Sequence, residues 1–263
     1  MPALRLLALD IDGTLLRSDS TLSTANAQAV RAIQERGVHV ILASGKPPWA
    51  MRTLAEQLNL PGPHVTANGA GIWSRSSGVE LLGRISWEDV HRALDYGKEQ
   101  ALPRALSGPR GVFCQPAWRP DDVTQALREV GEDPPTVVAE ACTAERDPWK
   151  VILIARRGVR LPPCPELNHG IWVRTGTAFL ETVPGNTSKA TAVAEICRRM
   201  DIPQSGVAAI GDSENDIPLL RWAAVSIAMG QSPPEVQRSA HHVTATNDRD
   251  GVARALEQLF GGE

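Results

Sequence analysis

Several side chains that could do chemistry lie where the strands of a parallel sheet would end or a helix would begin. They are four aspartates, an asparagine, a lysine and a Ser-Gly pair: Asp10, Asp12, Ser44, Gly45, Lys189, Asp212, Asn215 and Asp216. Carboxylates from two strand ends cannot share one crevice unless a cation compensates them. Oxygen ligands without a nearby histidine or cysteine select a hard ion, Mg²⁺ before Zn²⁺. The residue types therefore predict a Mg²⁺ site.

The remaining polar groups of this set are suited to a phosphate. The Ser44 hydroxyl, the Gly45 amide and the Lys189 ammonium would all donate to phosphate oxygens. Each is weak alone, because a Ser-Gly pair is usually a turn and a helical lysine is usually solvated. The Asp-x-Asp-Gly sequence could also begin a calcium loop or cap a turn, but the later positions lack the glycine and glutamate of an EF-hand. Only the combination of the aspartates with Ser44, Gly45 and Lys189 indicates a metal and phosphate site.

The elements that would position these groups alternate between strands and helices. The first part of the chain predicts strands at 4–10, 38–44 and 64–68 and helices at 23–36 and 48–58. The last part predicts helices at 188–200, 214–222, 234–239 and 250–260 and strands at 206–210 and 224–229. This alternation is typical of an α/β fold with a doubly wound parallel sheet. The carboxyl ends of such strands carry the functional groups.

The middle of the chain has a different pattern. It predicts helices at 86–100 and 120–130 and strands at 111–114, 136–140, 149–155, 170–174 and 177–183. Three prolines within 161–170 forbid a regular helix there, so we expect a surface loop or a shortened element. We therefore predict a core formed by residues 1–82 and 183–263, with an α+β domain inserted at 83–182.

The composition excludes several classes of protein. A hydrophobic content of 42% and a charged content of 22% are ordinary for a globular chain and argue against a disordered or fibrous one. The net charge of −3 gives no basic field for nucleic acid. No apolar run approaches the roughly 20 residues that span a bilayer. Four separated cysteines without C-x-x-C spacing fit a reducing compartment. We expect a cytoplasmic protein without nucleic-acid or membrane partners.

Four segments resemble the motifs of a known superfamily. They are DIDGTL (10–15), ASGKP (43–47), TSKATAV (187–193) and GDSENDIPLL (211–220). Together they resemble the haloacid dehalogenase superfamily, in the order and spacing of its Cof-like branch, subclass IIB. ANGA (67–70) is similar to that branch as well. The resemblance covers both flanks of the chain, is poor over the insert, and implies a parallel-sheet core with a C2B-type cap domain.

The resemblance implies a role for each matching residue. Asp10 would be the nucleophile that forms an aspartyl-phosphate, and Asp12 would be the general acid and then the general base. The Mg²⁺ ligands would be the Asp10 and Asp212 carboxylates and the Asp12 backbone carbonyl, with Asp216 in the first shell or directly behind it. The phosphate would be bound by Ser44, Lys189 and Asn215.

Two positions depart from the family pattern. Lys46 stands where arginine is more usual, which would alter contacts with substrate or solvent. Ala190 stands where glycine is common after the lysine, and we expect a small effect.

These roles predict a Mg²⁺-dependent phosphomonoester hydrolase acting on a small phosphorylated metabolite, with sugar phosphates as the favoured class. An acid at position 12 favours rapid hydrolysis of the aspartyl-phosphate. One alternative is a hexose phosphomutase, which arginines of the insert would serve: Arg104, Arg110 and Arg119. Another is a non-enzymatic sensor of Mg²⁺ and a phosphometabolite. Arg119 and Glu181 are candidate substrate contacts, with hinge packing an equal alternative for Glu181. The sequence predicts no oligomeric state.

Overall fold

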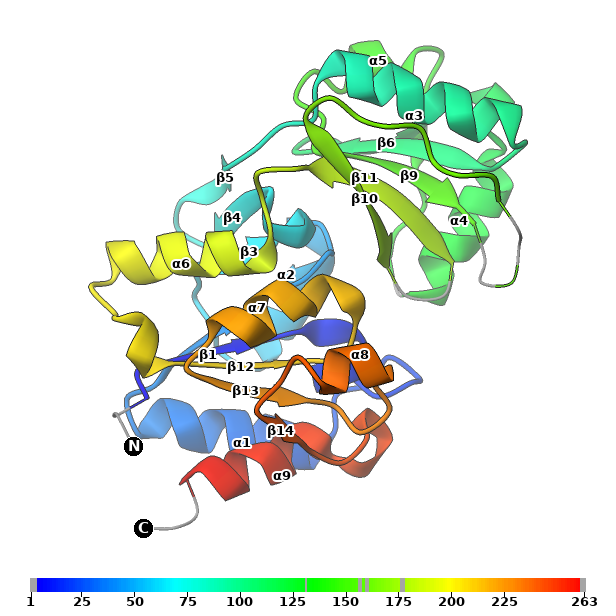
Figure 1. The fold of residues 1–263 in the computed structure, drawn as a ribbon. Coiled ribbons are helices and arrows are strands. Elements are labelled where there is room, and N and C mark those ends of the chain that lie inside the picture. Colours follow the sequence, from blue (N-terminus) through cyan, green and yellow to red (C-terminus); the bar gives the residue numbers. More distant parts are fainter. Residues whose placement is uncertain (1–3, 131, 156–157, 159–160, 176–177, 261–263) are drawn as a thin grey trace. The chain divides into compact units, whose positions relative to one another are not determined.

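The computed structural model describes residues 4–130, 132–155, 158, 161–175 and 178–260. The chain divides into two compact units. Unit 1 combines Met1–Glu80 with Ser188–Glu263, and unit 2 is Leu81–Thr187. Figure 1 shows the course of the chain through both units. Unit 1 carries all the residues of the four motifs except Thr187.

A five-stranded parallel sheet forms the centre of unit 1. Its strands are β1 (Leu6–Leu9), β2 (His39–Leu42), β12 (Val207–Gly211), β13 (Val225–Ala228) and β14 (His242–Val243). Their order is β14-β13-β12-β1-β2. In β1, Leu9 lies opposite Ile210 of β12 and Leu42 of β2. The predicted parallel-sheet core is confirmed, and the two strands that carry the aspartate motifs are direct neighbours.

Helices cover both faces of this sheet, which explains why its strands are almost continuously apolar. α1 (Thr24–Glu35) and α9 (Gly251–Phe260) pack together on one face, and α6 (Lys189–Arg199) and α7 (Ile217–Trp222) pack together on the other (Figure 1). α2 (Pro48–Gln57) follows β2, and the short α8 (Pro234–Gln237) follows β13. The predicted helix at 214–222 is divided, because Glu214–Asp216 forms a 3₁₀ turn before α7.

A small three-stranded sheet, which belongs to unit 1 apart from its last residue Leu81, was predicted only in part by the sequence pattern. β3 (His64–Thr66) was expected, whereas β4 (Gly71–Ser74) and β5 (Gly78–Leu81) were not. The turn between β3 and β4 has three successive residues with positive φ: Ala67 (50°), Asn68 (56°) and Gly69 (99°). A Cβ atom at Gly69 would overlap the Ser188 backbone, so this turn packs directly against the start of α6.

A six-stranded sheet forms the centre of unit 2. Its strands are β6 (Arg104–Gly108), β7 (Gly111–Cys114), β8 (Thr136–Val137), β9 (Lys150–Ile154), β10 (Gly170–Thr175) and β11 (Phe179–Pro184), in the order β10-β11-β9-β6-β7-β8. α3 (Trp87–Glu99) contacts β9, and α4 (Pro120–Glu129) contacts β6 and β9. The short helix α5 (Ala141–Ala144) completes the unit. The α+β composition agrees with the prediction, although β6 and α5 were not expected.

The proline-rich segment before β10 has no helix or strand over residues 161–169, as its prolines predict. The Asp89 carboxylate fixes its end by accepting the backbone N–H groups of Asn168, His169 and Gly170 at 2.7, 2.9 and 3.0 Å. The predicted strand at 136–140 is confined to β8, and position 177, where another strand was predicted to begin, lies outside the described residues. No helix among the described residues is long and apolar enough to cross a bilayer.

Candidate functional site

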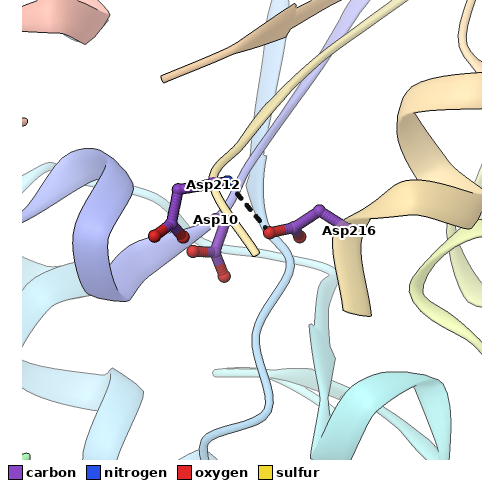
Figure 2. A group of neighbouring side chains, drawn as sticks. All are labelled: Asp10, Asp212 and Asp216. Atoms are coloured by element: carbon purple, nitrogen blue, oxygen red, sulfur yellow. Dashed lines mark hydrogen bonds between the residues drawn. The ribbon is translucent and has the colours of Figure 1, made fainter. Parts of the chain in front are cut away.

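Three aspartates meet at the carboxyl ends of β1 and β12. Asp10 directly follows β1 and donates its backbone N–H to Ile210 of β12 at 3.0 Å, which fixes the two strand ends side by side. Asp212 follows β12, and Asp216 lies one turn later. One oxygen from each carboxylate lies within 4.8 Å of the other two (Figure 2). The predicted juxtaposition of these acids is therefore present.

Lys189 lies among these acids. It is the first residue of α6, whose N-cap Ser188 accepts the N–H of Thr191. Its ammonium donates to Asp10 Oδ1 at 2.6 Å and to Asp216 Oδ1 at 2.7 Å, and its side chain is only 1% exposed. The lysine that the sequence placed at a helix start thus lies fully inside the acidic cluster.

The charges of this cluster do not balance. Burial, together with the charges of Asp216 and Asp212, raises the pKa of Asp10 well above its ordinary value, although Lys189 opposes the shift. Burial, followed by the charge of Asp216, raises the pKa of Asp212 to about 7. Burial lowers the pKa of Lys189, but Asp10 and Asp216 outweigh it and raise that pKa. Three carboxylates around one ammonium favour a further cation, and their oxygen donors fit a hard divalent ion.

The loop after β1 brings Asp12 to the surface beside the cluster. The Asp12 side chain is 45% exposed, and its Oδ2 lies 3.2 Å from the Lys46 ammonium. Gly13 has φ +75°, and a Cβ atom there would overlap the Asp212 carboxylate, so this position requires glycine. Thr14 Oγ1 donates to Asp212 Oδ1 at 3.4 Å. The DIDGT segment therefore folds tightly over Asp212.

The second carboxylate oxygen of Asp216 holds the loop that carries Asp212. Asp216 Oδ2 accepts the backbone N–H groups of Asp212 and Ser213, both at 3.1 Å. Its other oxygen, Oδ1, accepts a hydrogen bond from the Lys189 ammonium. Asp216 therefore contacts both the candidate ligand loop and the lysine.

Two of the predicted phosphate-binding residues, Asn215 and Gly45, lie against the side chain of Asn68, which the sequence analysis did not assign to the site. Asn215 Nδ2 donates to Asn68 Oδ1 at 2.9 Å, and a Cβ atom at Gly45 would lie 2.9 Å from the same oxygen. The Ser44 hydroxyl is buried and accepts the Lys46 N–H at 3.1 Å. Asn68 could have been found as the polar last residue of the predicted strand at 64–68, in the ANGA segment.

The two candidate substrate residues of the insert are engaged within unit 2. Glu181 is buried, with Lys150 Nζ 2.6 Å from Oε1 and Thr175 Oγ1 2.8 Å from Oε2. Arg119 pairs with Asp122 at 2.6 Å and borders a cavity of about 540 Å³ that α4 lines. Their role as substrate contacts stays a prediction.

The other arginines proposed to serve a mutase also have partners in unit 2. Arg110 pairs with the buried Glu145 at 3.2 Å. The Arg104 guanidinium lies 5.6 Å from the centre of the Trp118 ring. Neither contact favours the phosphomutase alternative.

Comparisons with known proteins agree on one family. A sequence model described as haloacid dehalogenase-like hydrolase matches residues 7–256. The 5-amino-6-(5-phospho-D-ribitylamino)uracil phosphatase YcsE of Bacillus subtilis is 26% identical over 260 residues, covering 96% of this chain and 94% of that protein.

Two solved structures are similar over nearly the whole chain. A phosphatase of the haloalkanoate (HAD) enzyme superfamily from Bacteroides thetaiotaomicron is 26% identical, with a TM-score of 0.81 over 98% of this chain and 95% of its own. A HAD subclass IIB sugar phosphatase shares the fold at 23% identity, with a TM-score of 0.84 over 98% and 99% of the two chains.

Proposed function

The chain belongs to the haloacid dehalogenase-like hydrolase family and is a phosphatase, and we propose that it transfers the phosphoryl group of a small phosphomonoester to Asp10 and then to water with the aid of Mg²⁺. The observation that carries this proposal is the cluster of the buried Asp10, Asp216 and Lys189 with the half-buried Asp212. It combines a carboxylate nucleophile, a set of hard-ion ligands and a fixed ammonium in one site.

Asp10 is suited to be the nucleophile. Its carboxylate is buried, and Lys189 binds one of its oxygens at 2.6 Å. A held, desolvated carboxylate can attack phosphorus without first losing a mobile water shell. In the proposed first step an Asp10 oxygen bonds to phosphorus while the bond from phosphorus to the leaving oxygen breaks.

Asp12 is suited to proton transfer. Its side chain is 45% exposed, so a leaving oxygen can approach it. We propose that Asp12 protonates the departing alcohol and then accepts a proton from the water that attacks the Asp10 phosphoryl group. A positioned acid or base contributes about 10²- to 10⁴-fold to such a step.

The metal proposal rests on the donor set. The carboxylates of Asp10 and Asp212 and the backbone carbonyl of Asp12 would hold Mg²⁺, while Asp216 lies within reach and orients the Asp212 loop. Bound Mg²⁺ would neutralise charge on the transferring phosphoryl oxygens. The cluster needs a further positive charge because it contains more carboxylates than ammonium groups.

The phosphate would contact donors from three separate segments of the chain. We propose that the Ser44 hydroxyl, the Gly45 amide, the Lys189 ammonium and the Asn215 amide bind its oxygens. The bond from Asn215 to Asn68 at 2.9 Å, and the close approach of Gly45 to Asn68, support a common location for two of these donors. Donors placed in advance stabilise the transition state because they need no reorganisation.

For the substrate we propose a phosphate ester of a primary alcohol on a sugar or polyol. The relative YcsE is named for a phosphorylated ribityl compound, and the shared fold of the subclass IIB sugar phosphatase is compatible with this class. The contacts of Arg104, Arg110 and Arg119 within unit 2 give no support to a mutase.

The deciding experiment is phosphate release from a panel of sugar, polyol and nucleotide monophosphates with Mg²⁺. Wild type should hydrolyse members of the panel, and Asp10→Asn should abolish turnover. Asp19→Asn is the matched control, because Asp19 is an exposed aspartate that binds Thr21. Mg²⁺-dependent phosphate release by Asp10→Asn would rule out the proposed mechanism. With a hexose 1-phosphate, free sugar indicates hydrolysis and hexose 6-phosphate indicates a mutase.

A further inference from the structure

Lys46 and Asp12 form an ion pair in which the two partners differ sharply in exposure. Lys46 Nζ lies 3.2 Å from Asp12 Oδ2, and the side chains are 7% and 45% exposed, respectively. Lys46 belongs to the loop between β2 and α2, whereas Asp12 belongs to the loop after β1. The pair therefore connects the ends of two neighbouring strands.

The backbone of Lys46 is fixed from several sides. Its N–H donates to Ser44 Oγ at 3.1 Å. Its carbonyl accepts the Ala67 N–H at 3.1 Å and the Thr66 hydroxyl at 2.6 Å. Lys46 thus extends from a rigid base, and its buried stem has little freedom to move the ammonium.

The Asp12 side chain is exposed, so burial does not restrain it. An exposed aspartate samples several rotamers, and a proton donor is effective only while it is within hydrogen-bond reach of the leaving oxygen. A buried ammonium attracts a nearby carboxylate more strongly than a solvated one does, because water screens it less. The Lys46 ammonium therefore restricts the Asp12 carboxylate to the rotamers that face it.

We propose that Lys46 is a positioning residue for leaving-group protonation, an inference that rests on the proposed function. Lys46 takes no part in the proton transfer. Asp12 passes its proton to the leaving oxygen as the bond between that oxygen and phosphorus breaks, and the negative charge left on Asp12 develops beside the ammonium. In the second step the same carboxylate, held in the same place, accepts the proton of the attacking water.

The test compares two leaving groups. Nitrophenolate departs from p-nitrophenyl phosphate with little need of a proton, whereas the alkoxide of an alkyl phosphate requires one. Hydrolysis of the Asp10 phosphoryl group is common to both substrates, so the comparison uses kcat/KM, which reports only the steps up to departure of the leaving group. Lys46→Met should lower kcat/KM for the best alkyl phosphate of the panel by about 10- to 100-fold, which is part of the contribution of a positioned acid. It should change kcat/KM for p-nitrophenyl phosphate far less. Lys46→Arg, which keeps the cation, should recover most of the loss.

Controls separate positioning from damage to the fold. Lys98→Met, at an exposed lysine of α3, should leave both activities unchanged. Adding Lys46→Met to Asp12→Asn should cause no further loss, because the residue through which Lys46 acts is already disabled. This double variant removes both charges, so it stays informative if Lys46→Met alone fails to fold.

Equal losses of kcat/KM on both substrates in a folded Lys46→Met protein would overturn the proposal, and so would a further loss of kcat/KM in the Asp12→Asn background. These outcomes are distinct from failure of the proposed function. That failure would appear as a wild type inactive on every alkyl phosphate, or as an active Asp10→Asn variant.

Discussion

The ammonium of Lys189 lies 2.6 Å from Oδ1 of Asp10, and the two residues are 179 positions apart in the chain. Both side chains are buried, at 1% and 7% exposure. The pair joins the start of α6 to the end of β1, so the lysine contributes both to the stability of unit 1 and to the proposed chemistry.

Replacing Lys189 by methionine should destabilise the protein in the absence of divalent cations. The substitution leaves Asp10 and Asp216 buried without their ammonium, and breaking a buried ion pair costs about 3–5 kcal/mol. Urea unfolding measures this loss. Added Mg²⁺ should narrow the difference from wild type, because a second cation then compensates the carboxylates. Activity should fall at least about 10²-fold at saturating Mg²⁺. If the variant were as stable as wild type without Mg²⁺, the Lys189 ammonium would not be compensating the carboxylates of Asp10 and Asp216.

Removal of divalent cations should abolish activity. The oxygens of Asp10, Asp212 and Asp216 converge within 4.8 Å of one another, and phosphoryl transfer needs charge neutralisation there. Dialysis against a chelator should stop phosphate release, and Mg²⁺ should restore it. Asp212→Asn should weaken Mg²⁺ binding at least about tenfold by calorimetry, whereas Asp248→Asn, at an exposed aspartate bound to Ser18, should not. Full activity after chelation would exclude a role for the metal.

Acid should destabilise unit 1 through His64. This side chain is fully buried, its Nδ1 accepts the Leu42 N–H at 3.1 Å, and its Nε2 faces the Leu60 carbonyl at 3.3 Å. The first bond assigns a neutral ring with the proton on Nε2. Burial lowers the pKa of His64 from 6.5 to about 4.

Acid destabilises the folded protein because the pKa of His64 is about 4 in the folded chain and 6.5 in the unfolded chain. Below pH 6.5 the unfolded chain binds a proton that the folded chain does not, so stability is lost as the pH falls from about 6.5 towards 4. The loss amounts to about 3 kcal/mol. His64→Gln should flatten the dependence of the unfolding free energy on pH over this range. His242→Gln, at an exposed histidine, should leave it unchanged. Equal slopes for wild type and His64→Gln would disprove the assignment.

The buried ion pair of Lys150 and Glu181 in unit 2 should contribute mainly to the stability of the fold. Burial lowers the pKa of Lys150, but the Glu181 carboxylate at 2.6 Å outweighs it and raises that pKa. Glu181→Leu leaves a buried ammonium without this carboxylate and should cost about 3 kcal/mol in unfolding free energy. The double variant Lys150→Met/Glu181→Leu should recover most of it. An increased KM without loss of stability would instead support Glu181 as a substrate contact.

The sequence predicted the elements whose apolar pattern is long and uninterrupted. β1 and β12 are buried throughout and were expected nearly within their observed bounds. β6 was missed because arginine and serine interrupt it. Arg104 is buried there beside the Trp118 ring, and the Ser107 hydroxyl accepts the indole N–H of Trp149 at 3.0 Å. A strand whose polar residues find partners inside the fold leaves no periodic signal in the sequence.

The site, like the fold, was predictable only where the local sequence carries a signal. The motif positions were predicted individually, because acids and a lysine stand out at the ends of apolar runs. The pairs that connect separate loops were not predicted, such as Asn215 with Asn68 and Lys46 with Asp12. Such contacts depend on how the strand ends are placed in space, and local sequence carries no information about them.

The division of unit 1 into two stretches of chain has a consequence during synthesis. The ribosome completes Met1–Glu80 and then all of Leu81–Thr187 before it reaches Lys189 and β12. During that interval the edge of β1 that receives β12 is open, and the nascent chain presents Asp10 without its lysine. Under the proposed mechanism, the growing polypeptide would release no phosphate until the last stretch of the chain, with Lys189 and β12, has joined β1.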